Sequence, residues 1–138
     1  MSDGLRSGAV VNYPYLWRWQ RDRGESEGRK ERPVCVILAV RRDEFTHLAL
    51  FAISSRPPDG AQIAIEVPEI ECKRAGLTEF KRTWVTVSEY NYDVAERSFY
   101  LDPNAPILGH FSRSFMMQLA SAAAPLFRHR SARIDRTD

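Results

Sequence analysis

The chain lacks most of the motifs that mark common enzyme classes. Its 138 residues include two cysteines, Cys35 and Cys72, which lie far apart and match no metal-binding or redox spacing. The three histidines have no HxxxH partner and no dense carboxylate cluster beside them, so we expect no metal site and no cofactor. The phosphate-binding loop GxxxxGK does not occur. A Ser-His-acid triad built from distant residues stays open.

Long hydrophobic runs and a strong charge of one sign are also missing. The apolar runs fall far short of the roughly 18 residues of a membrane span, and "MSDGLRSG" has no signal-peptide core. We therefore expect a cytoplasmic protein with no membrane partner. Twenty Lys and Arg against 18 Asp and Glu give a net charge of +2, which indicates no strongly basic nucleic-acid binder but leaves a local basic surface open.

The hydrophobic content of 43% predicts one domain with one core over residues 1–127, followed by a charged, frayed tail over 128–138. Residues 9–19 alternate between apolar and polar positions and predict a half-buried strand, in which Pro14 requires an edge or a bulge. Residues 20–31 carry glycine and alternating charge without an apolar stripe, and so predict a mobile loop.

The rest of the chain predicts further short strands and two helices. Strands are expected at 34–40, 46–53, 62–67, 83–89 and 107–111, the first two as a hairpin, with an irregular connection over 91–106. Pro68 and Gly76 bracket a short helix, and Ser112 is a good N-cap for a C-terminal helix. We predict a mainly β (α+β) fold: a small β-barrel or strongly coiled sheet with a short helix and a C-terminal helix.

Polar residues at the predicted strand ends are the candidates for chemistry. Arg32 precedes one strand, Ser54 and Ser55 follow another, and Glu89 follows a third. In a small barrel these ends meet at one rim, where arginine could bind a phosphate through its two-pronged fork and serine could orient a ribose 2′-hydroxyl. Aromatic side chains nearby, Trp17 and Trp19, could stack on bases of single-stranded RNA. Each of these residues also has a purely structural interpretation, the tryptophans as core above all.

The order of these segments resembles the MazF/PemK family of type II toxins. The matching stretches are "SGAVVNYPYLW", a charged loop, "RPVCVILAV", "LALFAISSRPP", "WVTVSEYN" and "ILGHFSRSFMMQL", which together cover about residues 7 to 124. The resemblance implies an SH3-like barrel of CcdB/MazF type. It also implies a homodimer and metal-independent, sequence-selective cleavage of single-stranded RNA, with messenger RNA as the substrate.

The same resemblance assigns the site residues. Arg32 falls on the catalytic arginine of the family's R-P motif, and Ser54 falls on a hydroxyl residue that is usually threonine. Glu89 stands where the family has aspartate, with one methylene more. We therefore predict Arg32, Ser54 and Glu89 as catalytic residues. The residues predicted to bind RNA are Trp17, Trp19, Arg29, Lys30, Ser55 and Arg56.

Two alternatives and one partner accompany this prediction. The chain could be a non-catalytic module of the same fold that inhibits a protein target or binds RNA, or it could be an inactive relative. The family also implies a cognate antitoxin, whose acidic disordered segment would dock beside the 20–31 loop. The cations gathered there are Arg18, Arg21, Arg23, Arg29, Lys30 and Arg32.

The implied homodimer gives the first testable prediction. The aromatic-rich first strand and a helix face with Met116, Met117 and Ala120 are surfaces that two-fold pairing would bury. Light scattering at micromolar concentration is expected to give twice the chain mass of 15.9 kDa. A single species at the chain mass would contradict the dimer.

Overall fold

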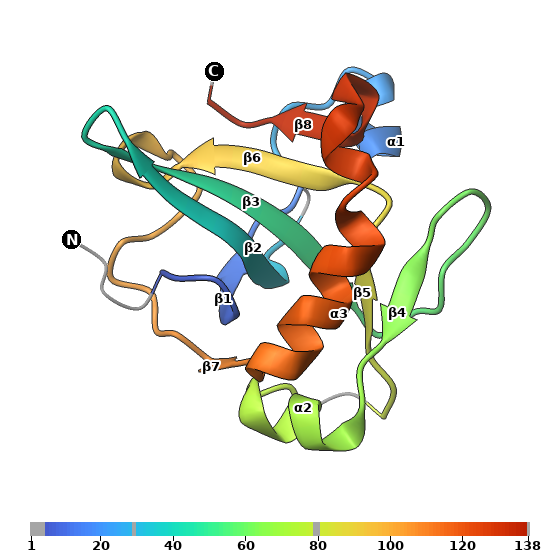
Figure 1. The fold of residues 1–138 in the computed structure, drawn as a ribbon. Coiled ribbons are helices and arrows are strands. Elements are labelled where there is room, and N and C mark those ends of the chain that lie inside the picture. Colours follow the sequence, from blue (N-terminus) through green and yellow to red (C-terminus); the bar gives the residue numbers. More distant parts are fainter. Residues whose placement is uncertain (1–4, 29, 79–80, 138) are drawn as a thin grey trace.

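A twisted, mainly antiparallel sheet dominates the computed structural model, which describes residues 5–28, 30–78 and 81–137 (Figure 1). In this part of the chain the sheet has eight strands, ordered β4-β5-β3-β2-β1-β7, with β6 paired to β3 and β8 paired to β6. The sheet curls into a half-barrel with few helices, so the predicted α+β class is confirmed. The strands are β1 Ala9–Tyr13, β2 Arg32–Arg42, β3 Phe45–Ser54, β4 Ala64–Glu66, β5 Trp84–Thr86, β6 Tyr90–Val94, β7 Gly109–His110 and β8 Arg133–Asp135.

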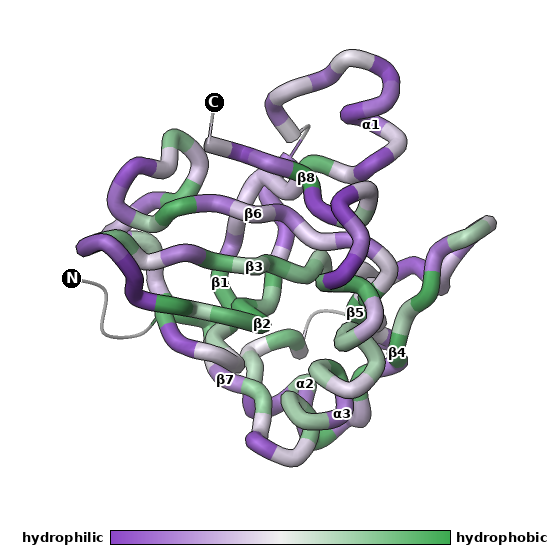
Figure 2. Tube along the Cα trace, turned by 45° about the horizontal axis from the view of Figure 1, so that its top comes forward, coloured by the Kyte–Doolittle hydropathy of each residue, from purple (hydrophilic) through white to green (hydrophobic). Residues whose placement is uncertain are grey.

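The hairpin of β2 and β3 lies at the centre, and its inner part, residues 34–37 and 48–53, is buried on both faces. On one face Cys35 and Phe51 pack beneath helix α3 (Arg113–Ala123), and on the other Val36 and Leu50 pack against Tyr13. A strand between two apolar layers reads as a near-continuous apolar run, which is the pattern of residues 34–37. Figure 2 shows this apolar character along β2 and more hydrophilic residues around α1.

The helices include α1 (Arg18–Asp22), α2 (Glu69–Arg74) and α3, with short 3₁₀ turns at Ala95–Arg97, Leu126–Arg128 and Arg130–Ala132. The predicted N-cap is confirmed, because the Ser112 hydroxyl accepts a hydrogen bond from the Phe115 amide at 3.2 Å. The face of α3 that was expected to pack in a dimer is divided between the core and the surface. Met116 packs inward against Cys35, whereas Met117 is exposed. Across the described residues, no helix has the length and apolar character that a membrane span requires.

Two segments near the N-terminus differ from the prediction. The first strand ends at Tyr13 because Pro14 has no amide hydrogen to donate to the sheet. The alternation that continues through Tyr15 and Trp17 belongs to a buried extended segment, and the chain then turns into α1. The expected mobile loop over 20–31 therefore begins as the second half of a short helix.

Two further strands lie where none was expected. All of β6 except its first residue falls within the predicted irregular connection. Asn91 and Asp93 are polar residues in a buried strand, and they hide its apolar pattern. The tail expected to fray instead forms β8, which pairs in parallel with β6 and buries Ile134 completely. Both strands depend on partners far away in the sequence, which local patterns do not show.

Gly76 gives a testable prediction for this fold. Its φ of +72° is strained for any other residue, and a Cβ there would overlap the Leu108 carbonyl oxygen. Gly24 has a φ of +90° but open space around it, so it is a matched control for the backbone strain alone. Gly24→Ala should cost about 1–2 kcal/mol of unfolding free energy and Gly76→Ala clearly more, measured by urea denaturation. Equal losses at both positions would contradict the close approach to Leu108.

Candidate nucleic-acid interface

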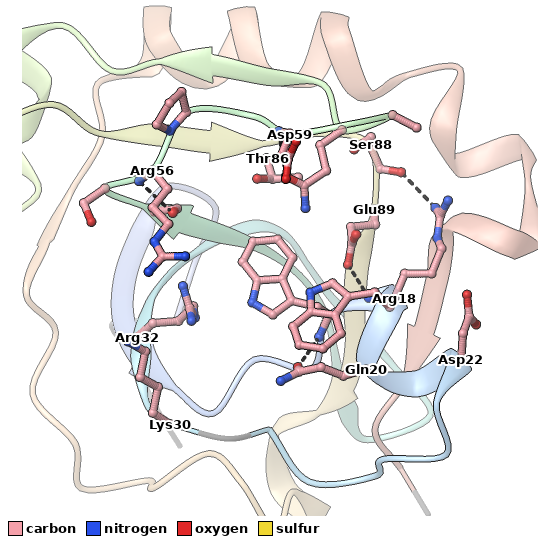
Figure 3. A pocket seen from close by; sticks show the side chains of 17 residues that line it. Arg18, Gln20, Asp22, Lys30, Arg32, Arg56, Asp59, Thr86, Ser88 and Glu89 are labelled. Carbon is pink, nitrogen blue, oxygen red and sulfur yellow. Dashed lines mark hydrogen bonds between the residues drawn. The ribbon is translucent and has the colours of Figure 1, made fainter.

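The ends of β2, β3 and β5 meet α1 around an open groove of about 690 Å³ (Figure 3). The structure therefore brings together every predicted site residue that it describes, and Arg29 lies outside the described residues. The groove is lined by Trp17, Arg18, Trp19, Gln20, Asp22, Lys30, Arg32, Ser54, Ser55, Arg56, Pro57, Asp59, Ala61, Gln62, Thr86, Ser88 and Glu89.

The register of the central hairpin explains why Arg32 and Ser54 share this groove. Val34 pairs with Ala52 across the two strands. Extending that antiparallel register by two residues brings Arg32, the first residue of β2, opposite Ser54, the last residue of β3. Two residues 22 positions apart therefore lie side by side at one end of a rigid hairpin.

Arg32 is a half-buried cation without an ion-pair partner among the described residues. Its guanidinium lies 5.2 Å from the centre of the Trp17 ring. Its buried Nε makes no hydrogen bond to any described residue. Burial lowers the pKa of Arg32, and the positive charge of Arg56 lowers it further. The groove thus holds a fixed positive charge with free hydrogen-bonding capacity.

A second cation faces Arg32 from the loop after β3. Figure 3 shows the guanidinium groups of Arg56 and Arg32 next to each other, with Lys30 on the same side of the groove. The turn that places Arg56 closes when its amide donates to the Ser54 hydroxyl oxygen at 3.0 Å. The Ser54 hydroxyl still has its own hydrogen to donate. Two like charges held together favour an anion between them, and a phosphate has the matching geometry.

The two tryptophans differ in exposure. Trp17 is only 8% exposed and meets the Tyr15 ring edge-to-face at 4.9 Å, so it belongs to the hydrophobic core as well as to the groove wall. Trp19 is 44% exposed, with the Arg23 guanidinium 5.4 Å from its ring centre. Of the two, Trp19 has the ring surface on which a base could stack.

Glu89 is buried and already engaged. Its Oε2 accepts hydrogen bonds from the Arg18 amide at 2.9 Å and the Tyr15 hydroxyl at 3.2 Å. The Arg18 side chain reaches back and donates to the Ser88 carbonyl oxygen at 3.0 Å. Burial raises the pKa of Glu89 despite these donors. These contacts fix the start of α1, so Glu89 has a structural task that the sequence did not reveal.

Sequence reasoning missed several groove residues. Thr86 of β5 is buried and lines the groove, and the alternation of residues 83–89 places it on the same face of the strand as Ser88, opposite Val85 and Val87. Gln20 is also buried, and its side-chain oxygen accepts from the Trp17 amide at 2.9 Å. No sequence signal marks Gln20, because its role depends on a helix that was not predicted.

One motif in the sequence does not form the site that its letters would indicate. The stretch "GESEG" over 24–28 matches the GxSxG pattern of a nucleophile elbow. That elbow joins a strand to a following helix, whereas these residues follow α1 and precede β2. Ser26 does not line the groove, and its carbonyl oxygen accepts a hydrogen bond from Tyr100.

Comparisons with known proteins do not extend these observations. No protein-family model, no curated protein and no solved structure matches the chain. Among the described residues, no group of three or more His, Cys, Asp or Glu side chains is arranged to hold a metal ion. The resemblance to the MazF/PemK family therefore stays a prediction.

The raised pKa of Glu89 makes a prediction about stability. Because the folded protein releases this proton at higher pH than the unfolded chain does, wild type should lose stability as pH rises from the usual glutamate range through the raised value. Glu89→Gln keeps an acceptor for Arg18 and Tyr15 but has no proton to release. The variant should therefore gain stability relative to wild type across this pH range, measured by urea denaturation between pH 4 and pH 8. A difference between the two proteins that does not change with pH would contradict the raised pKa.

Proposed function

We propose that the chain is a MazF/PemK-like endoribonuclease, the toxin of a type II toxin–antitoxin pair, with an SH3-like barrel of CcdB/MazF type. The observation that supports it most is the meeting of Arg32 and Arg56 beside the Ser54 hydroxyl in one open groove. Arg32 and Ser54 also stand at predicted strand ends and in the segments that resemble the family.

The scissile phosphate binds between the two guanidinium groups. Each can donate two parallel hydrogen bonds to phosphoryl oxygens, and Arg32 stands directly before residues 34–37, which are buried on both faces of the sheet. A cation that is already in position needs no rearrangement when charge develops on the phosphate. Arg32 is thus suited to stabilise the transition state more than the bound substrate.

The nucleophile is the ribose 2′-hydroxyl of the substrate. Its oxygen attacks the adjacent phosphorus and loses its proton, while the bond to the 5′-oxygen breaks and that oxygen gains a proton. The products are a 2′,3′-cyclic phosphate and a 5′-hydroxyl. The Ser54 hydroxyl, one of whose lone pairs is bonded to the Arg56 amide, orients the 2′-hydroxyl or a phosphoryl oxygen.

The open groove favours a single strand over a duplex. An unpaired strand can place its phosphates toward Arg32, Arg56 and Lys30 while one base stacks on the exposed ring of Trp19. A paired base has no free face to offer for such stacking. Carboxylates line the other part of the groove, where Figure 3 shows Glu89 and Asp22.

A second candidate function is RNA binding without cleavage. It is favoured by the engagement of Glu89, whose Oε2 already accepts hydrogen bonds from the Arg18 amide and the Tyr15 hydroxyl and so holds the start of α1. The same groove would then act on RNA or on an acidic protein segment through charge alone. The proposed antitoxin would bind these same cations.

The proposed mechanism predicts which substitutions abolish cleavage. Arg32→Ala should lower the rate by about 10²–10³ through loss of a charged donor to the phosphate. Arg32→Lys should recover little, because an ammonium group lacks the guanidinium fork. Ser54→Thr should be tolerated and Ser54→Ala should not. The measurement is cleavage of a long single-stranded RNA with its new 5′ ends mapped, in the presence of EDTA.

Controls separate catalysis from folding and from contamination. Arg113→Ala, an exposed arginine on α3 away from the groove, should cleave at the wild-type rate. RNA with 2′-deoxyribose at the cleaved position should stay intact, and every variant must keep the wild-type circular dichroism and melting temperature. Cleavage that disappears in EDTA, or that persists in folded Arg32→Ala, would overturn the mechanism. RNA binding without cleavage in wild type would favour the second candidate.

A further inference from the structure

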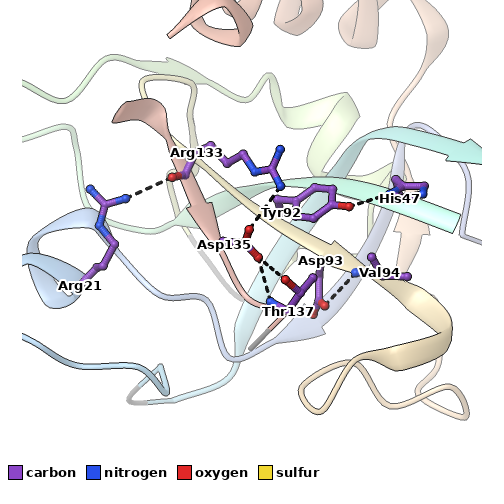
Figure 4. A network of polar contacts seen from close by, with 8 residues as sticks. All are labelled: Arg21, His47, Tyr92, Asp93, Val94, Arg133, Asp135 and Thr137. Atoms are coloured by element: carbon purple, nitrogen blue, oxygen red, sulfur yellow. Dashed lines mark hydrogen bonds and ion pairs between the residues drawn. The ribbon is translucent and has the colours of Figure 1, made fainter. Parts of the chain in front are cut away.

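The residues that form β8 attach the far end of the described chain to the central sheet. Arg133 pairs with Tyr90 and Asp135 with Tyr92 in parallel register. The Arg136 amide then extends this pairing by donating to the Tyr92 carbonyl oxygen at 2.9 Å. Figure 4 shows β8 lying beside Tyr92, over whose ring the Arg133 guanidinium sits at 3.8 Å. The backbone of residues 133–136 is thus fixed by its pairing with β6, and side chains on it can position neighbouring segments.

The side chain of Arg136 reaches from this strand to the segment before α1. It is only 2% exposed, and its Nη1 donates to the Pro14 carbonyl oxygen at 2.7 Å and to Asn91 Oδ1 at 3.0 Å. Asn91 in turn bonds both backbone groups of Leu16, accepting from the amide at 2.9 Å and donating to the carbonyl at 2.8 Å. Residues 14–16 are therefore held through one buried guanidinium and one buried amide.

A second contact holds the other end of the same segment. The Arg21 Nη1 donates to the Arg133 carbonyl oxygen at 3.1 Å, from the last turn of α1 to the first residue of β8 (Figure 4). Residues 133–136 therefore hold the segment 14–22 at two points, one before α1 and one in its last turn. Between these two points lie the groove residues Trp17, Arg18, Trp19 and Gln20.

Burying a guanidinium is unfavourable, and the surroundings of Arg136 offset this only in part. Its charge lies 3.9 Å from the Tyr100 ring centre and 5.3 Å from that of Tyr13, whose hydroxyl donates to Asp93 at 2.7 Å. Nε and Nη2 make no hydrogen bond to the described residues. An apolar side chain of similar size would fill the site at lower electrostatic cost. What it could not replace is the bond to Pro14.

We propose that Arg136 is a positioning residue for the groove, and that residues 133–136 form a C-terminal clamp on the wall made by α1. The clamp sets where Trp19 and Arg18 stand relative to Arg32, although none of residues 133–136 lines the groove. The expected effect of this clamp on RNA binding rests on the proposed function, whereas its effect on the position of the α1 wall is independent of that function.

The test compares local hydrogen exchange in Arg136→Met and Arg21→Gln with wild type. Methionine fills the buried space without the bond to Pro14, and Arg21→Gln changes a partly exposed side chain and so keeps the fold if the first variant does not. Amides of residues 15–18, 20 and 21, which are bonded in wild type, should exchange about tenfold faster or more in Arg136→Met and several-fold faster in Arg21→Gln. Amides of β2 and β3 should keep their protection. Arg136→Lys, which keeps the charge and a donor, should restore part of it.

Phe115→Leu is the matched control, because it weakens the core under α3 without touching the clamp. It should speed exchange in β2 and β3 as much as in residues 15–21. In the RNA readout, Arg136→Met should weaken binding of a single-stranded RNA about tenfold. Unchanged exchange in residues 15–21, the Phe115→Leu pattern in Arg136→Met, or unchanged affinity despite faster exchange would each overturn the proposal. If wild type binds no RNA, the proposed function fails while the exchange result still decides the clamp.

Discussion

Burial of residues 34–37 and 48–53, the inner part of the β2–β3 hairpin, on both faces is the constraint on which the other features depend. A strand packed between two apolar layers cannot shift its register by one residue without exposing one layer and burying polar groups in the other. That register is what brings the start of β2 and the end of β3 together. A charged side chain at such an end can be held in place without a partner of opposite charge, because the backbone that carries it is fixed by apolar packing elsewhere.

The wall opposite the hairpin is built differently. Residues 14–22 contribute Tyr15 and Trp17 to the core, but polar bonds to Asn91, Glu89 and Arg136 hold the backbone itself. Hydrogen bonds of this kind are directional and individually modest, and losing one partner leaves a buried group unsatisfied. The groove therefore combines one side fixed by apolar packing with another side fixed by specific polar contacts. This difference makes the second side the more sensitive to single substitutions.

The same difference explains how far the sequence could predict the structure. The hairpin, the helix capped by Ser112 and the residues at the strand ends follow from local apolar patterns, and they were found where expected. The strands β6 and β8 were not predicted, because Asn91, Asp93 and Arg136 read as surface residues until their distant partners are known. The role of Glu89 at the start of α1 was hidden for the same reason. Local patterns report burial of apolar groups well and burial of bonded polar groups poorly.

The position of the clamp in the chain has a consequence for biosynthesis. Residues 133–136 leave the ribosome after every residue that lines the groove, so the contacts of Arg136 with Pro14 and Asn91 form late. Until then the β2–β3 hairpin that positions Arg32 can fold, but the α1 wall lacks the hydrogen bonds from Arg136. In a nascent chain of this protein, the charged residues of the groove would be present before the contacts that fix the α1 wall can form. Translation itself would thus delay the point at which the α1 wall of the groove is held in place.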